Sequence, residues 1–313
     1  MSDPPKKESR DKVLIVGIGS GFGRVLARRL ARDYAVVGVD RQRISSKLPD
    51  IPLYRVDPRK RGFEDVFRTE RPRRVIHLGV ARRLDSKDAT RHDLNVRGTQ
   101  RILDHCLSYD VQQLVVLSTS YVYGALPDNP HFMTEEQPLG GSRHFPEMRD
   151  FISVDALCTS FMYQHPKLRI SVLRPVPVLG TTVSNVASRI MLAARAPLPL
   201  GFSPMLQFLH EDDLTEALRL TLERELRGVY NVEGPGELPL RVAVRESGGR
   251  PISIPDFLLS RLSGPLLGVP PGAIDFMRYP CTIDGSKFAK DAGFEPAFDL
   301  EDIFRDARSA RRH

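Results

Sequence analysis

A glycine-rich string near the N-terminus has the composition of a phosphate-binding loop. It reads GIGSGFG over residues 17–23 and lies between a short apolar run, KVLIV, and an amphipathic stretch that begins near Arg24. Backbone amides at glycines can approach an anion without a Cβ clash, and the N-terminus of a following helix adds partial positive charge. The residues expected to hold phosphate are Gly17, Gly19, Ser20, Gly21, Phe22 and Gly23.

An acidic residue follows at the distance expected for ribose recognition. Asp40 ends the apolar run YAVVGVD, 23 residues after Gly17. A carboxylate at this point can accept hydrogen bonds from both hydroxyls of an adenosine ribose. Its charge repels a 2′-phosphate, which favours NAD over NADP, although Arg41 and Arg43 keep NADP open as an alternative. The loop and the aspartate together predict an NAD site.

Short apolar runs alternate with helix-length amphipathic stretches from residue 12 onward. This alternation is typical of βαβ units, so the sequence predicts an α/β fold with a doubly wound, parallel-sheet Rossmann domain. Prolines and glycines cluster after residue 180, which indicates a smaller C-terminal domain of the substrate-binding type. The predicted division is a polar tail at 1–11, a dinucleotide-binding domain at 12–180 to which 208–232 returns, and the smaller domain at 181–207 and 233–313.

The composition excludes several classes of protein. Hydrophobic residues make up 41% of the 313, enough for a buried core. No run approaches the roughly 18 apolar residues of a membrane helix, and the first dozen residues lack the apolar segment of a secretory signal. Three well-separated cysteines offer neither a disulfide framework nor a metal site. We therefore expect a cytoplasmic protein.

Further segments extend the pattern along most of the chain. They are Val56-Asp57, the apolar run at 75–81, NVRGT at 95–99, LSTSYVYG at 117–124, Leu173-Arg174-Pro175, FLHEDD at 208–213 and GVYNV at 228–232. With the glycine loop, they make the chain resemble the extended short-chain dehydrogenase/reductases, the family of NAD-dependent sugar epimerases and dehydratases. The loop departs from the family's GxxGxxG, because Ser20 stands where the middle glycine is expected.

The resemblance implies further cofactor contacts. Family members contact adenine at the position of Asp57, and Arg82 falls at a cofactor-contacting position, with a merely solvated charge as the alternative. The other positions that the resemblance places at the cofactor are Leu78, Gly79, Val80, Asn95 and Pro175.

The resemblance also implies a catalytic set, and two of its three members are changed. Hydride transfer in the family depends on a Ser or Thr, a Tyr, and a Lys four residues after the Tyr. The ammonium lowers the pKa of the phenol toward neutral pH. Thr119 takes the Ser/Thr role, but Phe151 and Asp155 stand where the Tyr and the Lys are expected. Phenylalanine has no proton to exchange, and Asp155 cannot acidify a neighbour, although it could accept a hydrogen bond from the nicotinamide ribose or act as a replacement base.

Other residues capable of proton transfer have structural alternatives. The one literal Tyr-x-x-x-Lys, from Tyr163 to Lys167, contains a proline that interrupts the helical turn. His144 precedes the predicted helix, where it is either a solvated loop histidine or a residue facing the cleft. Structural roles are expected for His77 and His210.

Two functions stay open. One is an NAD-dependent enzyme acting on a nucleotide sugar or a similar carbonyl or hydroxyl compound, with Thr119, a replacement acid/base such as Asp155 or His144, and a substrate contact at Asn185, where nucleotide-sugar enzymes often place one. The other is a catalytically impaired dinucleotide-binding sensor, which the changes at Phe151 and Asp155 suggest.

The charge distribution raises a third hypothesis, nucleic-acid binding. The first 100 residues carry 24 basic and 13 acidic side chains, so an anionic partner there is conceivable. Arg24, Arg28 and Arg32, however, recur at the spacing of a solvated helix face, which disfavours this hypothesis. The apolar faces of helices expected at 90–108 and 151–164 permit a homodimer.

Overall fold

A computed structural model describes residues 10–44, 48, 50–78, 91–143 and 145–310. The chain divides into two compact units. Unit 1 consists of Met1–Ser118, Ser153–Leu173 and Leu218–Val229, and unit 2 consists of Thr119–Ile152, Arg174–Ala217 and Tyr230–His313. The domain division expected from the sequence stays a prediction.

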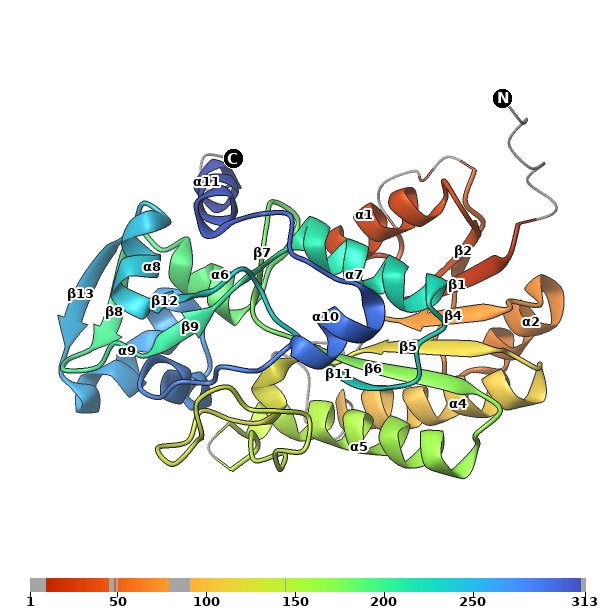
Figure 1. The fold of residues 1–313 in the computed structure, drawn as a ribbon, viewed down its shortest axis with the longest axis horizontal. Coiled ribbons are helices and arrows are strands. Elements are labelled where there is room, and N and C mark those ends of the chain that lie inside the picture. Colours follow the sequence, from red (N-terminus) through yellow and green to blue (C-terminus); the bar gives the residue numbers. More distant parts are fainter. Residues whose placement is uncertain (1–9, 45–47, 49, 79–90, 144, 311–313) are drawn as a thin grey trace. The chain divides into compact units, whose positions relative to one another are not determined.

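Unit 1 is built on a seven-stranded sheet with the order β11-β6-β5-β4-β1-β2-β3 (Figure 1). The pairings of β1 with β2 and β4, of β2 with β3, and of β5 with β4 and β6 are all parallel. The strands are β1 (Lys12–Val16), β2 (Ala35–Asp40), β3 (Leu53–Arg55), β4 (Arg74–His77), β5 (Gln113–Leu117), β6 (Arg169–Pro175) and β11 (Gly228–Val232). The predicted doubly wound α/β fold is confirmed.

The strand order reverses between β1 and β4. The chain moves outward from β1 through β2 to β3 and then returns to place β4 on the other side of β1. In open parallel sheets, ligands bind beyond the carboxyl ends of the strands at such a reversal. The segments that follow β1, β2 and β4 are therefore the ones expected to meet a ligand.

Helices cover both faces of this sheet, which is why its central strands are almost wholly apolar. Figure 1 shows α4 and α5 along one face and α1 along the other. A tilted ring contact between Phe67 and His105, with centroids 5.4 Å apart, joins α2 to α4. The helices are α1 (Gly21–Leu30), α2 (Arg61–Glu70), α4 (Gly98–Ser108), which the π-helix η2 (Asp93–Arg97) precedes, α5 (Arg149–Gln164), of which 149–152 belong to unit 2, and α7 (Glu211–Glu223), of which 211–217 belong to unit 2.

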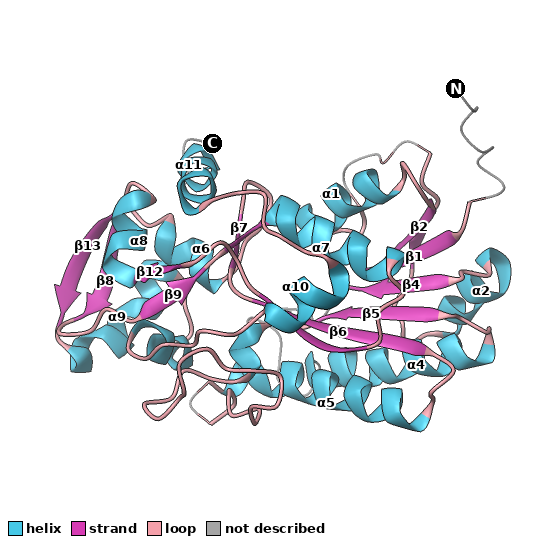
Figure 2. Cartoon of the chain, in the orientation of Figure 1, coloured by secondary structure: helices cyan, strands magenta, loops and turns pink. Residues whose placement is uncertain are grey.

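Unit 2 has short strands that pair two by two between loops (Figure 2). The pairs are β7 (Val178–Leu179) with β10 (Leu209–His210), β8 (Arg195–Pro199) with β13 (Arg250–Ile254), and β9 (Met205–Gln207) with β12 (Glu237–Pro239). The helices are η3 (Ser120–Val122), η4 (Pro146–Met148), α6 (Val186–Met191), α8 (Leu240–Glu246), α9 (Asp256–Leu267), η5 (Pro271–Met277), α10 (Ser286–Ala292) and α11 (Leu300–Ala310). Among the described residues, none of the helices has the length and apolar character needed to cross a membrane.

Candidate functional site

The glycine-rich string forms the turn between β1 and α1, and Ser20 is the N-cap of the helix. Its Oγ accepts a hydrogen bond from the backbone N–H of Gly23 at 2.9 Å. A serine in this position satisfies one of the amides that a helix N-terminus leaves without an intrahelical partner. The residue that departs from the family's glycine pattern therefore stabilises the start of α1.

Two glycines of the loop are required by close approaches. A Cβ on Gly19 would lie 2.7 Å from Oδ2 of Asp40, and a Cβ on Gly23 would lie 2.8 Å from the carbonyl oxygen of Ile18. A side chain at Gly19 would displace the Asp40 carboxylate, and one at Gly23 would push against the backbone of the loop. A turn this tight is compatible with the predicted pyrophosphate site.

Asp40 is held in place by backbone amides on both of its oxygens. Oδ2 accepts from Gly19 N at 2.9 Å and Oδ1 accepts from Gln42 N at 2.8 Å. Each oxygen keeps lone-pair capacity for a further donor, as ribose recognition requires. A fixed carboxylate beside the loop also opposes a 2′-phosphate, while Arg41 behind it is exposed.

Arg24 lies at the loop rather than on a purely solvated helix face. Its Nη1 donates to the carbonyl oxygen of Gly19 at 2.7 Å. Arg28 on α1 and Arg32, just beyond its end, are the exposed ones of the three arginines. One positive charge of the predicted stripe therefore belongs to the glycine loop.

Asp57 forms a bidentate pair with Arg59. Nε of Arg59 donates to Oδ1 at 3.0 Å and Nη2 donates to Oδ2 at 2.7 Å. The hydrogen bond from Arg59 is the largest cause of a pKa for Asp57 below its usual value. Arg59 also pairs with Asp93. The sequence reasoning missed Arg59, although the Asp-x-Arg spacing was a signal for it.

Leu78 lies beside the glycine loop, at the end of β4. Its backbone N–H donates to the carbonyl oxygen of Val16 at 3.0 Å, and its Cβ is 3.4 Å from where a Cβ on Gly17 would be. Pro175 ends β6 and is buried. Gly79, Val80 and Arg82, which the resemblance also places at the cofactor, lie outside the described residues, as does His144.

Asn95 and His77 belong to one buried chain of hydrogen bonds. Thr99 donates its hydroxyl to the carbonyl oxygen of Asn95 at 2.7 Å, and Nε2 of His77 lies 3.0 Å from the same hydroxyl oxygen. Because the threonine proton is used, we assign the histidine proton to Nε2. Burial lowers the pKa of His77 to about 4. His77 is therefore neutral at physiological pH, in keeping with a structural role.

The three positions predicted to be catalytic have different surroundings. Thr119 is half-buried, and its Oγ1 accepts from Tyr121 N at 3.4 Å, at the start of η3. Phe151 is 6% exposed, and Asp155 is 0% exposed. A hydrogen bond from Oγ of Ser118 reaches Oδ2 of Asp155 at 2.7 Å. This bond joins α5 to the end of β5, so the aspartate must move before it can exchange a proton with a bound molecule.

Asn185 is the N-cap of α6. Its Oδ1 accepts from Ser188 N at 2.8 Å, and its Nδ2 donates to the carbonyl oxygen of Val178 at 2.7 Å. Both ends of the amide are thus used by the backbone. A substrate contact at Asn185 stays a prediction, and it would compete with these bonds.

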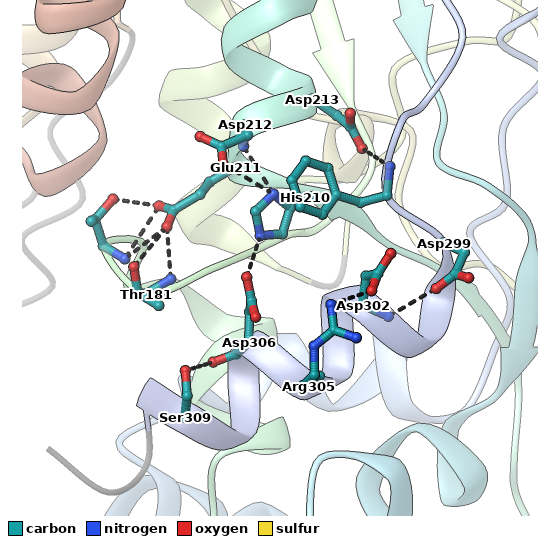
Figure 3. Close-up of polar contacts among 12 residues, drawn as sticks. Thr181, His210, Glu211, Asp212, Asp213, Asp299, Asp302, Arg305, Asp306 and Ser309 are labelled. Carbon is teal, nitrogen blue, oxygen red and sulfur yellow. Dashed lines mark hydrogen bonds and ion pairs between the residues drawn. The ribbon is translucent and has the colours of Figure 1, made fainter.

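The loop before Asn185 is fixed by Glu211, as Figure 3 shows. The carboxylate accepts hydrogen bonds from the backbone N–H of Thr181 at 2.7 Å and of Thr182 at 3.2 Å, and from both threonine hydroxyls. Glu211 is 5% exposed, and these hydrogen bonds compensate the burial of its carboxylate. No local sequence pattern predicted that Glu211 holds this loop.

His210, next to Glu211, is enclosed by side chains of unit 2 (Figure 3). Its Nδ1 accepts from Asp212 N at 3.2 Å, its ring stacks on Phe298 with centroids 3.9 Å apart, and its Nε2 lies 3.4 Å from Oδ2 of Asp306. These contacts agree with the structural role expected for His210. Within the described ranges, no group of three or more His, Cys, Asp or Glu side chains is arranged to hold a metal ion.

Residues 13–232 match the family model described as the NAD dependent epimerase/dehydratase family. The chain belongs to this family. The resemblance inferred from the motifs is therefore confirmed, and the family's dependence on NAD agrees with the predicted cofactor.

Curated relatives are distant in sequence. An uncharacterized protein of Mycobacterium tuberculosis is 25% identical over 313 residues, covering 94% of this chain and 82% of its own. UDP-glucose 4-epimerase 4 of Oryza sativa subsp. japonica is 28% identical over 192 residues, covering 55% of this chain and 51% of its own.

Solved structures share the fold over nearly the whole chain. The UDP-glucose 4-epimerase of Thermus thermophilus, in complex with NAD, has a TM-score of 0.75 at 22% identity and covers 96% of this chain and 99% of its own. The dTDP-glucose 4,6-dehydratase of Streptomyces venezuelae, with NAD bound, has a TM-score of 0.75 at 19% identity, covering 96% and 97%. The UDP-glucose 4-epimerase of Thermotoga maritima, with UDP-glucose, has a TM-score of 0.72 at 18% identity, covering 96% and 98%.

Proposed function

We propose that the protein binds NAD(H) at the glycine loop of unit 1 and exchanges hydride reversibly with a nucleotide sugar or a similar carbonyl or hydroxyl compound. The observation that carries the proposal is Asp40, whose carboxylate two backbone amides fix beside the loop. Membership of an NAD-dependent family supports the cofactor. Solved neighbours with UDP-glucose or NAD support the substrate class.

The residues on the cofactor side have distinct tasks in this proposal. NAD, when bound, supplies the hydride acceptor or donor. Asp40 accepts hydrogen bonds from the ribose hydroxyls. Gly19 and Gly23, where a Cβ would clash, leave the turn compact enough for the pyrophosphate to approach its backbone amides. Arg59 keeps Asp57 ionised and fixed, ready to accept from the adenine amino group. Leu78, Asn95 and Pro175 line the cofactor further.

On the reaction side, Thr119 orients the substrate. Its Oγ1 accepts a long hydrogen bond, 3.4 Å from Tyr121 N, and a hydroxyl that accepts in this way can still donate its proton to a substrate oxygen. A hydrogen bond to that oxygen is strongest when it carries negative charge, which favours the charged species during proton transfer.

A second candidate, an NAD(H)-binding sensor that does not turn over, is favoured by one observation. Phe151 and Asp155 fill the positions of the usual acid/base pair and are 6% and 0% exposed. Loss of a positioned general acid/base costs roughly 10² to 10⁴ in rate. Unless another side chain replaces the pair, binding without turnover is the expected behaviour.

Nucleic-acid binding is not proposed, because acidic partners within unit 1 already engage several of the N-terminal arginines. Arg73 and Arg74 both pair with Asp11, and Arg68 pairs with Asp65. Charges that are neutralised within the protein contribute little to binding a phosphate backbone.

A homodimer and a cytoplasmic location complete the proposal. Leu107 on α4 is 39% exposed and Tyr163 on α5 is 72% exposed, which leaves apolar surface on the two helices. Light scattering of the purified protein would measure twice the mass of one chain if the dimer forms, and the mass of one chain if it does not.

Isothermal calorimetry of NAD binding tests the function. We expect wild-type protein to bind NAD, Asp40→Ala to bind it at least about tenfold more weakly, equivalent to about 1.4 kcal/mol, and Asp33→Ala, an exposed aspartate of the same unit, to bind it normally. Wild-type protein that releases no heat with NAD or NADH would contradict both candidates.

Absorbance of NADH then separates the enzyme from the sensor. Protein loaded with NAD is mixed with UDP-glucose and dTDP-glucose as probes. Reduction of the bound NAD by either sugar supports the enzyme. Binding of NAD with no reduction by the sugars supports the sensor.

A further inference from the structure

The exposed large hydrophobic residues are unevenly distributed along the chain. Nine are exposed in the part that the structure describes, and five of them lie between residues 200 and 258 of unit 2. These five are Leu200, Val242, Ile252, Phe257 and Leu258. Single exposed apolar side chains are ordinary on protein surfaces, whereas several in one region indicate a contact with a partner.

Four of these residues lie where β13 ends and α9 begins. Ile252 is on β13, and Phe257 and Leu258 are in the first turn of α9, which starts two residues after the strand ends. The backbone N–H of Leu200 donates to the carbonyl oxygen of Ile254, the last residue of β13, at 3.0 Å. Figure 1 shows α9 beside the pair of β8 and β13. The four residues therefore belong to one small region of unit 2.

Two arginines flank this region on the strand pair. Arg250 on β13 lies directly opposite Arg195 on β8 in the parallel register, and both are exposed. Among the described residues, no Asp or Glu forms an ion pair with either of them. Like charges on neighbouring strands repel each other. An anion that pairs with both guanidinium groups would relieve this repulsion.

A third arginine shares a face of α9 with the apolar residues. Arg261 follows Phe257 by four residues and Leu258 by three, the spacings at which side chains are neighbours on a helix surface. Arg261 is exposed, and Phe257 is 71% exposed. Such a face suits a membrane interface, because the ring can enter the boundary of the lipid while the guanidinium meets a phosphate.

The two acidic residues between residues 241 and 261 have arginine partners of their own. Asp256 accepts hydrogen bonds from Nε and Nη2 of Arg278, at 2.8 and 2.5 Å. A carboxylate oxygen of Glu246 lies 4.0 Å from Nη1 of Arg308. The positive charge of the three unpaired arginines is therefore not cancelled by these neighbours.

Two other kinds of occupant fit this region less well. β13 pairs with β8 alone among the described strands, and Arg250 and Ile254 direct their backbone hydrogen bonds to β8. By alternation, Pro251 and Ser253 face the free edge, and a proline has no N–H to offer an added strand. A second copy of the chain, related by a two-fold axis, would bring arginines against arginines.

We propose that this region docks on an anionic phospholipid bilayer. The arginine–apolar face, as we name it, consists of Arg195, Arg250, Ile252, Phe257, Leu258 and Arg261. Its apolar side chains enter the boundary between headgroups and acyl chains, and its guanidinium groups pair with lipid phosphates. A peripheral contact of this kind needs no helix that crosses the membrane. The inference goes beyond the proposed function and does not depend on it.

The chain contains no tryptophan, so Phe257→Trp creates a single fluorescent reporter within the arginine–apolar face. We expect its emission to move to shorter wavelength with vesicles of phosphatidylcholine and phosphatidylglycerol in equal parts, and to stay unchanged with phosphatidylcholine alone. Phe132→Trp is the matched control, at a phenylalanine of unit 2 that is 45% exposed and lies outside this face. Its emission should not change with either kind of vesicle.

Sedimentation of the protein with the same vesicles measures its affinity for them. Arg250→Gln should bind the anionic vesicles about fivefold more weakly, equivalent to about 1 kcal/mol for one arginine at such a surface. Phe257→Ser should bind at least about tenfold more weakly, because it removes the most exposed apolar side chain of the face. Arg28→Gln, at an exposed arginine of α1 in unit 1, should bind as the wild type does.

Three results would overturn the proposal. Wild-type protein does not sediment with anionic vesicles, it sediments equally with neutral ones, or Phe257→Ser leaves its sedimentation unchanged. Light scattering supplies a further test: a wild-type dimer that Phe257→Ser dissociates would assign the face to a second copy instead. Calorimetry of NAD binding should give the same affinity for all these variants, so failure of the membrane contact leaves the proposed function intact.

Discussion

The glycine loop and the positions of the family's Tyr and Lys use different parts of the chain's chemistry. In the loop, Gly19, Gly23 and the amide that holds Asp40 act through the backbone. At the predicted catalytic positions the chemistry depends on side chains, and both Phe151 and Asp155 are buried. The loop needs only small residues and one carboxylate. The reaction needs particular functional groups at particular points.

This difference explains how the family's sequence pattern is largely kept in the glycine loop and changed at Phe151 and Asp155. A serine replaces the middle glycine of the loop and becomes the helix cap, so the geometry gains a hydrogen bond. Replacing a lysine by aspartate changes the charge, and the new side chain finds a new partner in Ser118. Backbone sites tolerate small substitutions, whereas an enzyme that has lost a proton-transfer group needs another side chain to replace it.

The largest effect is expected from restoring the family's charge at position 155. Asp155→Lys places an ammonium where the side chain is 0% exposed, and it loses the hydrogen bond that Ser118 donates. An uncompensated buried charge costs about 3–5 kcal/mol, which urea unfolding would measure. Asp155→Asn keeps an acceptor for Ser118 and should lose less than about 1.5 kcal/mol. If Asp155→Lys is as stable as the wild type, position 155 is not a buried position that only an uncharged or hydrogen-bonded side chain can occupy.

A smaller effect on stability is expected when the pH is lowered, because His77 is buried. Burial lowers the pKa of His77 to about 4, against 6.5 as its ordinary value. The unfolded chain therefore binds the proton first, and stability is lost as the pH falls from 6.5 toward 4, by about 3 kcal/mol in total. His77→Gln should remove this part of the acid sensitivity in unfolding curves measured across that range. His131→Gln, with a half-exposed side chain, should retain it.

The smallest effect is expected at Ser20. Ser20→Ala removes the cap of α1 and should cost about 1 kcal/mol in the free energy of unfolding. Ser20→Gly, which restores the family's loop pattern, should cost only about 0.3 kcal/mol, because glycine is itself tolerated at an N-cap. A Ser20→Ala variant as stable as the wild type would show that the hydrogen bond from Gly23 N to the serine contributes nothing to stability.

Much of the cofactor side could be predicted from the sequence. The alternation of apolar runs and amphipathic stretches indicated the parallel sheet. The glycine spacing indicated the turn after the first strand, and the structure places the Asp40 carboxylate beside that turn. These features are local: a strand, a turn and a helix follow one another, and the residue types needed at each step are adjacent in the chain. The change at Phe151 and Asp155 was also visible, because it depends only on residue identity.

The partners of several site residues could not be predicted, because they are distant in sequence. Ser118 and Asp155 are 37 residues apart, and Arg59 and Asp93 are 34 apart. Such pairs depend on how each helix packs against the sheet after a crossover, which no local pattern encodes. The same is true of Phe276, whose ring packs against that of Tyr121 from a distant segment of unit 2.

The sequence by itself determined the fold, the nucleotide loop and the absence of the usual acid/base pair, since each follows from residue types at short spacing. Only the tertiary structure decided which side chains are sealed and which are presented. Burial and hydrogen-bond partners are properties of the packed chain: they bind Asp155 to Ser118 in the interior and leave Tyr121 half-exposed beside Thr119.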